Sequence, residues 1–269
     1  MTIFDKEFIR TMSLLEKRNA NTIFSWFLLI GMTVATAVVT CIKITDSDPE
    51  AKMMLLLAAF GSLMGIASSV SSANGKIITF LFGILDVSIY GIMCLLNWNN
   101  GSSGLGTGVL HLLYFFPMQF VGFYQWKRQG KNHSGSVNAK RLDKKHRILS
   151  SILFILIVIL SYIIICHFDK SASKSYIRLA VILDVLPFAC NIMGQLLMSF
   201  VYMEQWIFWL GVNTFSILMW SYTLHTTEDA TFSIIYIVKY SFYLINAVNG
   251  LRIWILLSRK NNLRLNSSR

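Results

Sequence analysis

The stretch IITFLFGILDVSIYGIMCLL at positions 77–96 decides the class of fold, because Asp86 is its one charged side chain. A helix rising 1.5 Å per residue over this length crosses a hydrocarbon core of about 30 Å. Similar runs recur along the chain, which is 55% apolar and 14% charged. Soluble domains carry about 25% charged residues. We therefore predict an all-α polytopic membrane protein and exclude a soluble domain or a disordered chain.

Eight apolar runs are expected to span the membrane. In chain order they are Ile23–Ile42, Met53–Ala73, Ile77–Leu96, Leu105–Gln125, Ser150–His167, Leu179–Phe200, Trp206–Leu224 and Phe232–Leu257. Before them lies Met1–Asn19, where Phe4, Phe8, Met12 and Leu15 recur at helical spacing among charges. That pattern predicts a short amphipathic helix on the membrane surface.

The distribution of basic residues predicts the orientation. Of the 24 Lys and Arg residues, seventeen lie on the side of the two termini and five on the opposite side. The remaining two, Lys239 and Arg252, lie near opposite ends of the last span, where long side chains snorkel. The positive-inside rule then places both termini in the cytoplasm. We interpret the basic segment Lys127–Arg147 as a topology signal and expect no nucleic-acid partner.

The chain also contains an internal repeat. Sliding the sequence by 128 positions places the third and fourth spans over the seventh and eighth, with identities at 80/208, 83/211, 88/216, 89/217, 122/250 and 126/254. One span links the two three-helix units, so the units run parallel, as in transporters that bind substrate between repeats. The expected organisation is a leading segment (1–50), a first unit with a basic loop (51–148), a linker helix (149–178) and a second unit (179–269).

Polar and aromatic side chains form stripes along the predicted spans, and such groups usually face a bundle interior or a cavity. A single amide could instead bond a neighbouring helix, and Trp206 could mark the interfacial belt. Stripes that combine rings and amides in both units favour a binding cavity. The stripes are Thr79, Phe82, Asp86 and Tyr90; His111, Phe115 and Gln119; Asp184, Phe188, Asn191 and Gln195; Trp206, Trp209 and Asn213; Tyr243, Asn246, Asn249 and Arg252.

Such a cavity suits a flat heterocycle, because rings stack on it, amides bond hydroxyl or carboxamide groups, and indole faces attract cations. No cluster of basic residues for a phosphate is evident, so we expect an uncharged or cationic, unphosphorylated substrate. We expect no metal, no cofactor and no catalytic residue. Two other classes stay open: a lipid-modifying membrane enzyme with His111 and Asp86 as acid and base, and a structural assembly factor.

Two motifs carry a resemblance to a known family. They are W-x-x-W-x-x-x-N at positions 206–213 and N-G-x-R-x-W at positions 249–254. Asp184 and the end of the first unit, Gly122–Arg128, also fit the family pattern. From about Ala51 to Asn261 the chain resembles the PnuC family of vitamin transporters, whose typical member carries nicotinamide riboside.

The resemblance implies a 3+1+3 helix arrangement related to the sugar-transporting SWEET proteins, here with one extra N-terminal helix. It also implies a homotrimer in the bacterial cytoplasmic (inner) membrane and facilitated diffusion of the vitamin. Intracellular phosphorylation would then trap the vitamin for NAD biosynthesis. Trp206, Trp209 and Asn213 would hold the nicotinamide ring and its amide, while Asn249 and Gln119 would contact the polar part.

The chain departs from the family at Asp86, where an asparagine is expected. Thiamine or riboflavin, which relatives carry, therefore stays an alternative substrate. Asp86 and Asp184 could also bind a proton or sodium ion, although a structural role for Asp184 is favoured. The candidate binding residues are Asp86, Gln119, Asp184, Asn191, Gln195, Trp206, Trp209, Asn213, Tyr243, Asn246 and Asn249.

Overall fold

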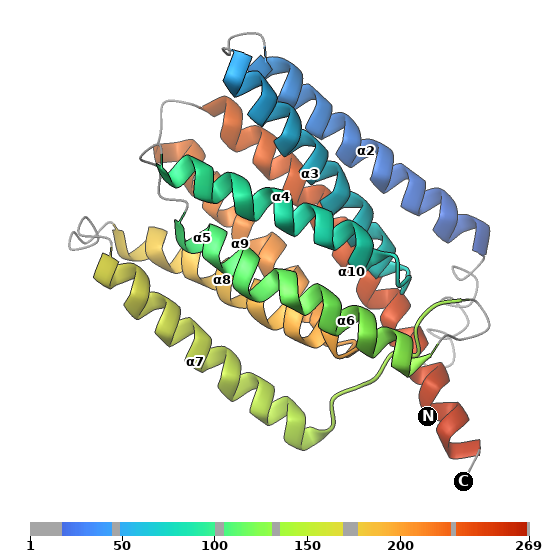
Figure 1. Ribbon diagram of the computed structural model, residues 1–269. Coiled ribbons are helices and arrows are strands. Elements are labelled where there is room, and N and C mark those ends of the chain that lie inside the picture. The colour runs from blue at the N-terminus through green and yellow to red at the C-terminus, as the bar shows by residue number, and fades with distance from the viewer. Residues whose placement is uncertain are drawn as a thin grey trace.

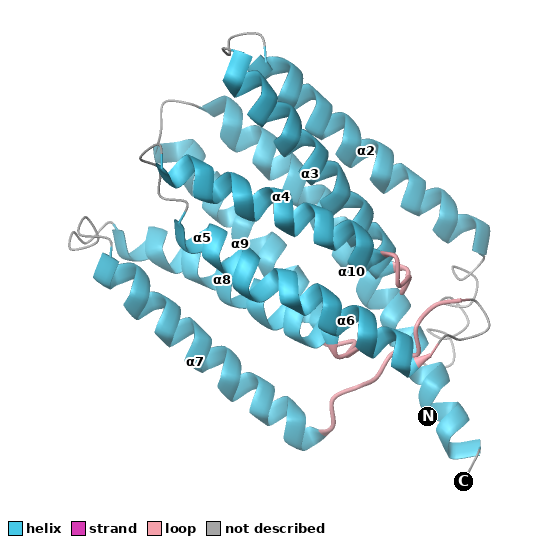
Figure 2. Ribbon diagram, in the orientation of Figure 1, coloured by secondary structure: helices cyan, strands magenta, loops and turns pink. Residues whose placement is uncertain are grey.

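The computed structural model describes residues 18–44, 49–99, 105–130, 135–168, 177–226 and 230–267. Within these ranges the chain is helical apart from short turns and one loop (Figures 1 and 2). The elements are α2 (Arg18–Ile44), α3 (Pro49–Ala73), α4 (Thr79–Asn99), α5 (Leu105–Leu110), η1 (His111–Phe115), α6 (Phe116–Gln129), α7 (Lys144–Phe168), α8 (Ile177–Ser199), α9 (Gln205–Thr226) and α10 (Ala230–Ser267).

Every predicted span lies in a helical part of the structure. The fourth one consists of α5, the π-helical turn η1 and α6 in direct succession, and the seventh is α9. The predicted amphipathic helix falls almost entirely on residues 1–17, which lie outside the described residues. By length and composition, six of the described helices can cross a membrane: Asn21–Ile44, Lys52–Ala73, Thr79–Leu96, Lys144–Ile164, Val181–Ser199 and Tyr236–Arg259.

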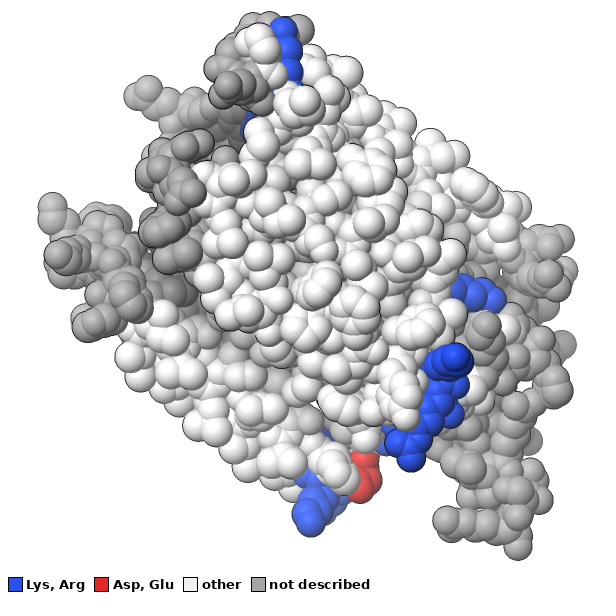
Figure 3. Space-filling model, in the orientation of Figure 1, with Lys and Arg blue, Asp and Glu red and all other residues white. Residues whose placement is uncertain are grey.

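The helices run side by side in one bundle (Figure 1). Helix α3 packs on α2, α4 and α10, while α8 packs on α6, α7 and α9, and α9 packs on α10. Helices α2 and α7 lie at opposite edges of the bundle in this view. The face drawn in Figure 3 is a broad band of uncharged side chains with Lys and Arg near its ends, as expected for helices in a bilayer.

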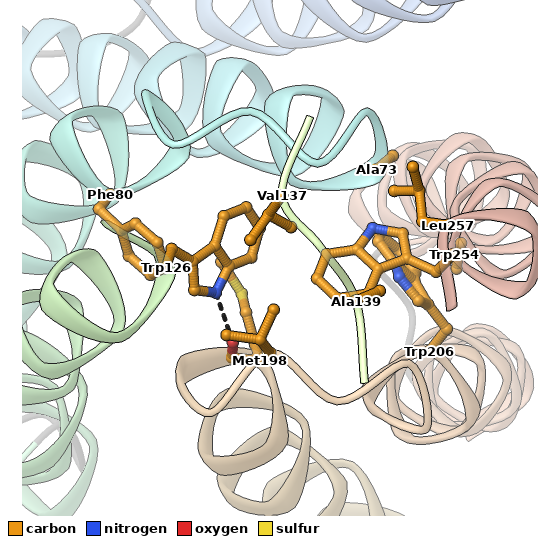
Figure 4. Packing of buried hydrophobic residues seen from close by; sticks show 11 residues of the cluster. Ala73, Phe80, Trp126, Val137, Ala139, Met198, Trp206, Trp254 and Leu257 are labelled. Carbon is orange, nitrogen blue, oxygen red and sulfur yellow. Dashed lines mark hydrogen bonds between the residues drawn. The ribbon is translucent and has the colours of Figure 1, made fainter. Parts of the chain in front are cut away.

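A cluster of large rings fills one end of the bundle (Figure 4). We call Phe80, Trp126, Trp206 and Trp254 the tryptophan cluster; each side chain is at most 2% exposed. The ring centroids of Trp126 and Trp254 are 5.3 Å apart, and Phe80 meets Trp126 edge-on at 4.9 Å. Edge-on and tilted contacts of this kind stabilise ring pairs beyond the area they bury.

Two hydrogen bonds in this cluster are reciprocal. The indole Nε1 of Trp126 donates to the backbone carbonyl of Met198 at the end of α8, at 2.7 Å (Figure 4). The indole Nε1 of Trp254 donates to the carbonyl of Ser72 at the end of α3, at 2.9 Å. Each carbonyl also accepts a backbone N–H from the turn that follows its helix, Val201 for Met198 and Gly75 for Ser72, so the indole adds a second hydrogen bond. The end of each predicted unit is thereby fastened to the first helix of the other unit.

A loop crosses this end of the bundle, and we call its residues 135–142 the strap. Val137 and Ala139 are buried in the strap and lie beside the rings of Trp126 and Trp254 (Figure 4). Val137 N–H donates to the carbonyl of Gly75 in the turn after α3. Lys140 exchanges two backbone hydrogen bonds with the turn after α8, donating to Val201. The strap therefore bridges the two equivalent turns.

The two turns themselves require unusual backbone. Gly75 has φ +64° and Val201 has φ 68°. Glycine adopts this left-handed region freely, whereas a β-branched residue there costs about 1–3 kcal/mol. Val201 is fully buried, and its carbonyl accepts the strap hydrogen bond from Lys140. Packing and hydrogen bonding thus hold the strained turn in place.

Helix α2 packs on α3 and α10 through Leu28 and Met32, which are buried beside Ile66 and Val70. Gly31 makes this possible, because a Cβ there would lie 2.6 Å from the ring of Phe242 on α10. The helix is therefore an integral wall of the bundle.

Candidate functional site

A cavity of about 790 Å³ lies between the helices. Its volume falls in the range of about 300–1,000 Å³ typical of small-molecule sites. Side chains from α2, α3, α4, α8, α9 and α10 and from the α5–η1–α6 series line it. Ser72, Met198, Trp206 and Ala247 are lining residues that also contact or belong to the tryptophan cluster. The cluster therefore forms the floor of the cavity.

Two indoles lie at the floor. Trp206 is 2% exposed, and its ring fits against Gly250, where a Cβ would come within 2.5 Å of the ring. Trp209 is half-buried, and its ring fits in the same way against Gly194 on α8. Trp206 is thus part of the core and the lining, and the interfacial-belt interpretation is wrong for it. The half-buried ring of Trp209 offers flat apolar surface on which a heterocycle can stack, and Trp206 supports the floor from within the core.

Amide side chains surround these rings. Gln119 from α6 donates to Gln195 Oε1 on α8 at 3.4 Å, and Gln195 donates to the hydroxyl of Ser199 at 3.1 Å. The Gln119 Oε1 atom is buried and has no partner within the described part of the chain. Asn213 and Asn191 donate to the carbonyls four residues earlier on α9 and α8. The site thus presents amide oxygens to a ligand that carries hydroxyl or carboxamide groups.

The cavity also contains opposite charges. Asp86 on α4 packs against Gly65 of α3, where a Cβ would lie 2.9 Å from Oδ2. Lys239 on α10 points its Nζ toward the rings of Tyr236 and Tyr243, at 6.0 and 5.9 Å from the centroids. All these residues line the same cavity. Lys239 does not snorkel to the membrane surface, so that expectation is wrong.

The π-helical turn η1 shapes one wall. The ring of His111 lies between those of Tyr90 and Phe115, at 4.7 and 4.9 Å. In the same turn, the hydroxyl of Tyr114 donates a hydrogen bond to the carbonyl of Ile192 on α8 at 2.7 Å. A π-turn widens the helix locally and is frequent at functional sites.

Eight of the eleven predicted binding residues line this cavity: Asp86, Gln119, Asn191, Gln195, Trp206, Trp209, Asn213 and Tyr243. Asn246, Asn249 and Asp184 are not among the lining residues. Asn246 is buried behind the wall and donates to Ser69 Oγ at 2.8 Å. Asp184 lies on the exposed face of α8.

Asn249 belongs to a polar network that attaches α2. Its Oδ1 accepts from the guanidinium of Arg252 at 2.8 Å, and the same nitrogen donates to Asn21 Oδ1 at 3.1 Å. Asn21 in turn donates to Asn74 at the end of α3, at 2.6 Å. The N-G-x-R-x-W motif thus has two structural functions: its polar part bonds to α2, and its Trp254 fastens the two halves of the bundle.

Lys239 is the main cavity residue that the sequence interpretation missed. A signal was present, since Tyr236, Lys239, Tyr240 and Tyr243 follow the i, i+3, i+4, i+7 spacing of one helix face. The small polar wall from α2 and α3, including Thr36, Ser62 and Ser68, was also missed. Among the described residues, no group of three or more His, Cys, Asp or Glu side chains could hold a metal ion.

Comparison with known proteins gives concordant matches. The model of a family described as "Nicotinamide mononucleotide transporter" matches residues 55–256. The chain is 30% identical over 208 residues to the nicotinamide riboside transporter PnuC of Haemophilus influenzae, covering 77% of this chain and 82% of that protein. Identity to the PnuC of Neisseria mucosa is 28% over 212 residues, covering 77% and 74%.

A solved structure is also similar. The crystal structure of the vitamin B3 transporter PnuC superposes with a TM-score of 0.63 at 26% identity, covering 88% of this chain and 93% of the other. The matched family range begins within α3, so α2 lies before it. The lining residues that carry the rings and amides of the cavity all lie inside the matched range.

Proposed function

Since the chain belongs to the nicotinamide mononucleotide transporter family, we propose that it is a multi-pass carrier of nicotinamide riboside. The observation that carries this proposal is the floor of the cavity, where the indoles of Trp206 and Trp209 lie among the amides of Gln119, Gln195 and Asn213. Rings of this kind stack on a pyridine ring, and the amides match its carboxamide and the ribose hydroxyls. The similar proteins of Haemophilus influenzae and Neisseria mucosa are both named as nicotinamide riboside transporters.

The proposed transport mode rests on the sequence. The chain contains no G-x-x-x-x-G-K-[ST] motif for ATP, so we propose facilitated diffusion rather than ATP-driven uptake. Trapping by phosphorylation, supply of NAD biosynthesis and the homotrimer remain predictions. The matched relatives are transporters, and we propose a carrier without catalytic activity.

We further propose the eight-span, 3+1+3 architecture with α2 as the additional helix and the boundaries given above. The reciprocal hydrogen bonds of Trp126 and Trp254 support it, because two equivalent units would make two equivalent bonds. The basic residues support an inner-membrane orientation with both termini in the cytoplasm. In that orientation the tryptophan cluster and the strap close the cytoplasmic end.

The test is ligand binding to the purified protein. Stacking on one aromatic ring contributes about 1–3 kcal/mol, so Trp209→Ala should weaken riboside binding by about tenfold or more. Ile207→Ala is the matched control, because Ile207 lies on the same helix and is 55% exposed. Unchanged affinity in a folded Trp209→Ala protein would contradict the proposal.

Substrate identity needs a second comparison. Nicotinamide riboside should stabilise the wild type in thermal unfolding at lower concentration than thiamine, riboflavin or nicotinamide mononucleotide, because a ligand that binds the native state raises its stability. The mononucleotide is included because Lys239 and Lys43 both line the cavity and could contact a phosphate. Uptake into liposomes without an ion gradient or ATP would support facilitated diffusion, and a strict requirement for either would contradict it.

A further inference from the structure

The cavity contains one carboxylate among its described lining residues, Asp86, and the ammonium of Lys239 lines the same cavity close enough to interact with it electrostatically. We propose that Asp86 binds the positive charge of the transported ring and that Lys239 is its exchangeable counterion in the empty carrier. The carrier would thereby select a cationic ring over a neutral ring of the same shape. This inference rests on the proposed function and adds the charge of the substrate to it.

Asp86 is placed to receive a ligand. Its carboxylate lies against Gly65, so the missing side chain on α3 gives the carboxylate its space. Within the described part of the chain, no hydrogen-bond donor occupies this carboxylate. A carboxylate in a membrane protein is costly unless it is paired or faces a water-filled cavity. Asp86 therefore has acceptor capacity to offer to a cation.

Lys239 balances this charge without direct contact. Within the described part of the chain, no ion pair within 4.0 Å joins this ammonium and this carboxylate, so the two groups are further apart. The Lys239 Nζ instead lies about 6 Å from the centroids of Tyr236 and Tyr243, where ring faces attract a cation. A counterion held at this distance, on a flexible side chain, can move away when a ligand cation arrives.

The remaining charge in the lining lies elsewhere. Lys43 is in the last turn of α2, and α2 and α3 are joined as a hairpin. Lys43 is therefore at the end of the cavity opposite the tryptophan cluster. Asp86 lies seven residues into α4, near the level of Asn213 and Asn191 in their helices. A ring stacked on Trp209 would thus lie near the negative charge and away from Lys43.

The experiment compares two forms of one nucleoside. Nicotinamide riboside carries a pyridinium cation, and its reduced dihydro form has the same ribose and carboxamide without the charge. The wild type should bind the cation at least tenfold more tightly, equivalent to 1.4 kcal/mol. Asp86→Asn, which keeps the volume of the side chain, should reduce this preference to less than about threefold. Asp184→Asn, the matched carboxylate outside the cavity lining, should retain the preference.

Lys239→Gln gives the sharper test, because a counterion and a direct ligand-binding group at this position predict opposite changes in affinity for the cation. As a counterion, Lys239 competes with the ligand, so its removal should leave cation affinity equal or higher. As a direct ligand-binding group, its removal should lower that affinity. A tenfold loss for the cation in a folded Lys239→Gln protein would overturn the proposal.

The remaining outcomes separate the two proposals. A wild type that binds both forms equally overturns charge selection and leaves the transport function standing. A wild type that binds neither form overturns the proposed function and, with it, this inference. If Asp86→Asn does not fold, the comparison of the two nucleoside forms on the wild type still tests charge selection, because it requires no variant.

Discussion

The two ends of the cavity differ in packing and in how completely their polar groups are hydrogen-bonded. At the floor, Trp126 and Trp254 are fully buried, and each indole N–H is bonded to a helix-end carbonyl. Higher up, Asp86 and Lys239 both line the cavity and form no ion pair within 4.0 Å, and the Lys239 ammonium lies over the rings of Tyr236 and Tyr243. A group with satisfied hydrogen bonds and tight packing resists rearrangement, whereas an incompletely bonded polar group leaves capacity for a ligand.

This difference separates the sources of stability and of specificity. The floor joins the two halves of the bundle through the cluster, the reciprocal bonds and the strap, so its loss should affect folding first. Asp86 and Lys239 line the cavity and lie outside the tryptophan cluster, so their loss should affect ligand choice first. Substitutions at the floor, at its border with the ligand site and outside the cavity can test this separation. The expected effects decrease in that order.

The largest effect is expected at Trp254. Trp254→Ala removes a fully buried ring and its bond to the Ser72 carbonyl, and large-to-small changes of this kind cost about 3–5 kcal/mol. Trp254→Phe keeps most of the ring and loses the hydrogen bond, so it should cost less, about 1–3 kcal/mol. Thermal unfolding of the purified protein measures both.

The control for Trp254 is a tryptophan outside the core. Trp26 on α2 is 60% exposed, so Trp26→Ala should change the unfolding temperature far less. Equal losses at the two positions would show that the reciprocal bonds and the ring cluster do not fasten the bundle.

An intermediate effect is expected at Gly250, where floor and ligand site meet. A Cβ at this position would lie 2.5 Å from the Trp206 ring, and overpacking costs about 1–3 kcal/mol. Because Trp206 lines the cavity, Gly250→Ala should also weaken riboside binding. Val248→Ala, on the exposed face of α10, is the control for both measurements. A destabilised variant with full affinity would show that the ring moves without consequence for the ligand.

Much of the fold could be predicted because membrane helices are set by local composition. Apolar runs gave every helical range, and stripes of rings and amides identified Trp209, Asn213 and Gln119 at the cavity. A helix in a bundle has neighbours on more than one side, however. Residues at the edge of a polar stripe can therefore contact a neighbouring helix instead of the cavity. Asn246 therefore bonds to α3, and Asn249 bonds to Arg252, which contacts α2, rather than lining the cavity.

Other features depend on tertiary contacts that no local pattern contains. Lys239 was assigned to the membrane surface because charges in spans usually snorkel, yet Asp86, about 150 residues earlier in the chain, provides an opposite charge inside. The strap reads as an ordinary basic loop in sequence, and its role follows only from bonds to the turns at Gly75 and Val201. The π-turn η1 likewise carries no evident sequence signal.

The smallest effect is expected outside the membrane, at the start of α7. Asp143 Oδ1 accepts from the backbone N–H and the ring nitrogen of His146, both at 2.7 Å, as an N-cap residue does. These hydrogen bonds, with the nearby positive charge of Lys145, hold the pKa of Asp143 below its ordinary value of 3.8. A pKa depressed by folding contributes stability above the unfolded value, and that contribution is lost as pH falls through the folded pKa.

Asp143→Asn keeps the cap, since asparagine caps as well as aspartate, and removes the charge. The wild type should therefore be slightly more stable than the variant near pH 7, and the difference should shrink as pH falls below about 4. Thermal unfolding of both proteins across this range measures it. A difference in stability that widens as the pH falls below about 4 would contradict the argument. Because Asp143 is exposed and is not among the residues that line the cavity, riboside affinity should be the same in the two proteins, in contrast to Gly250→Ala.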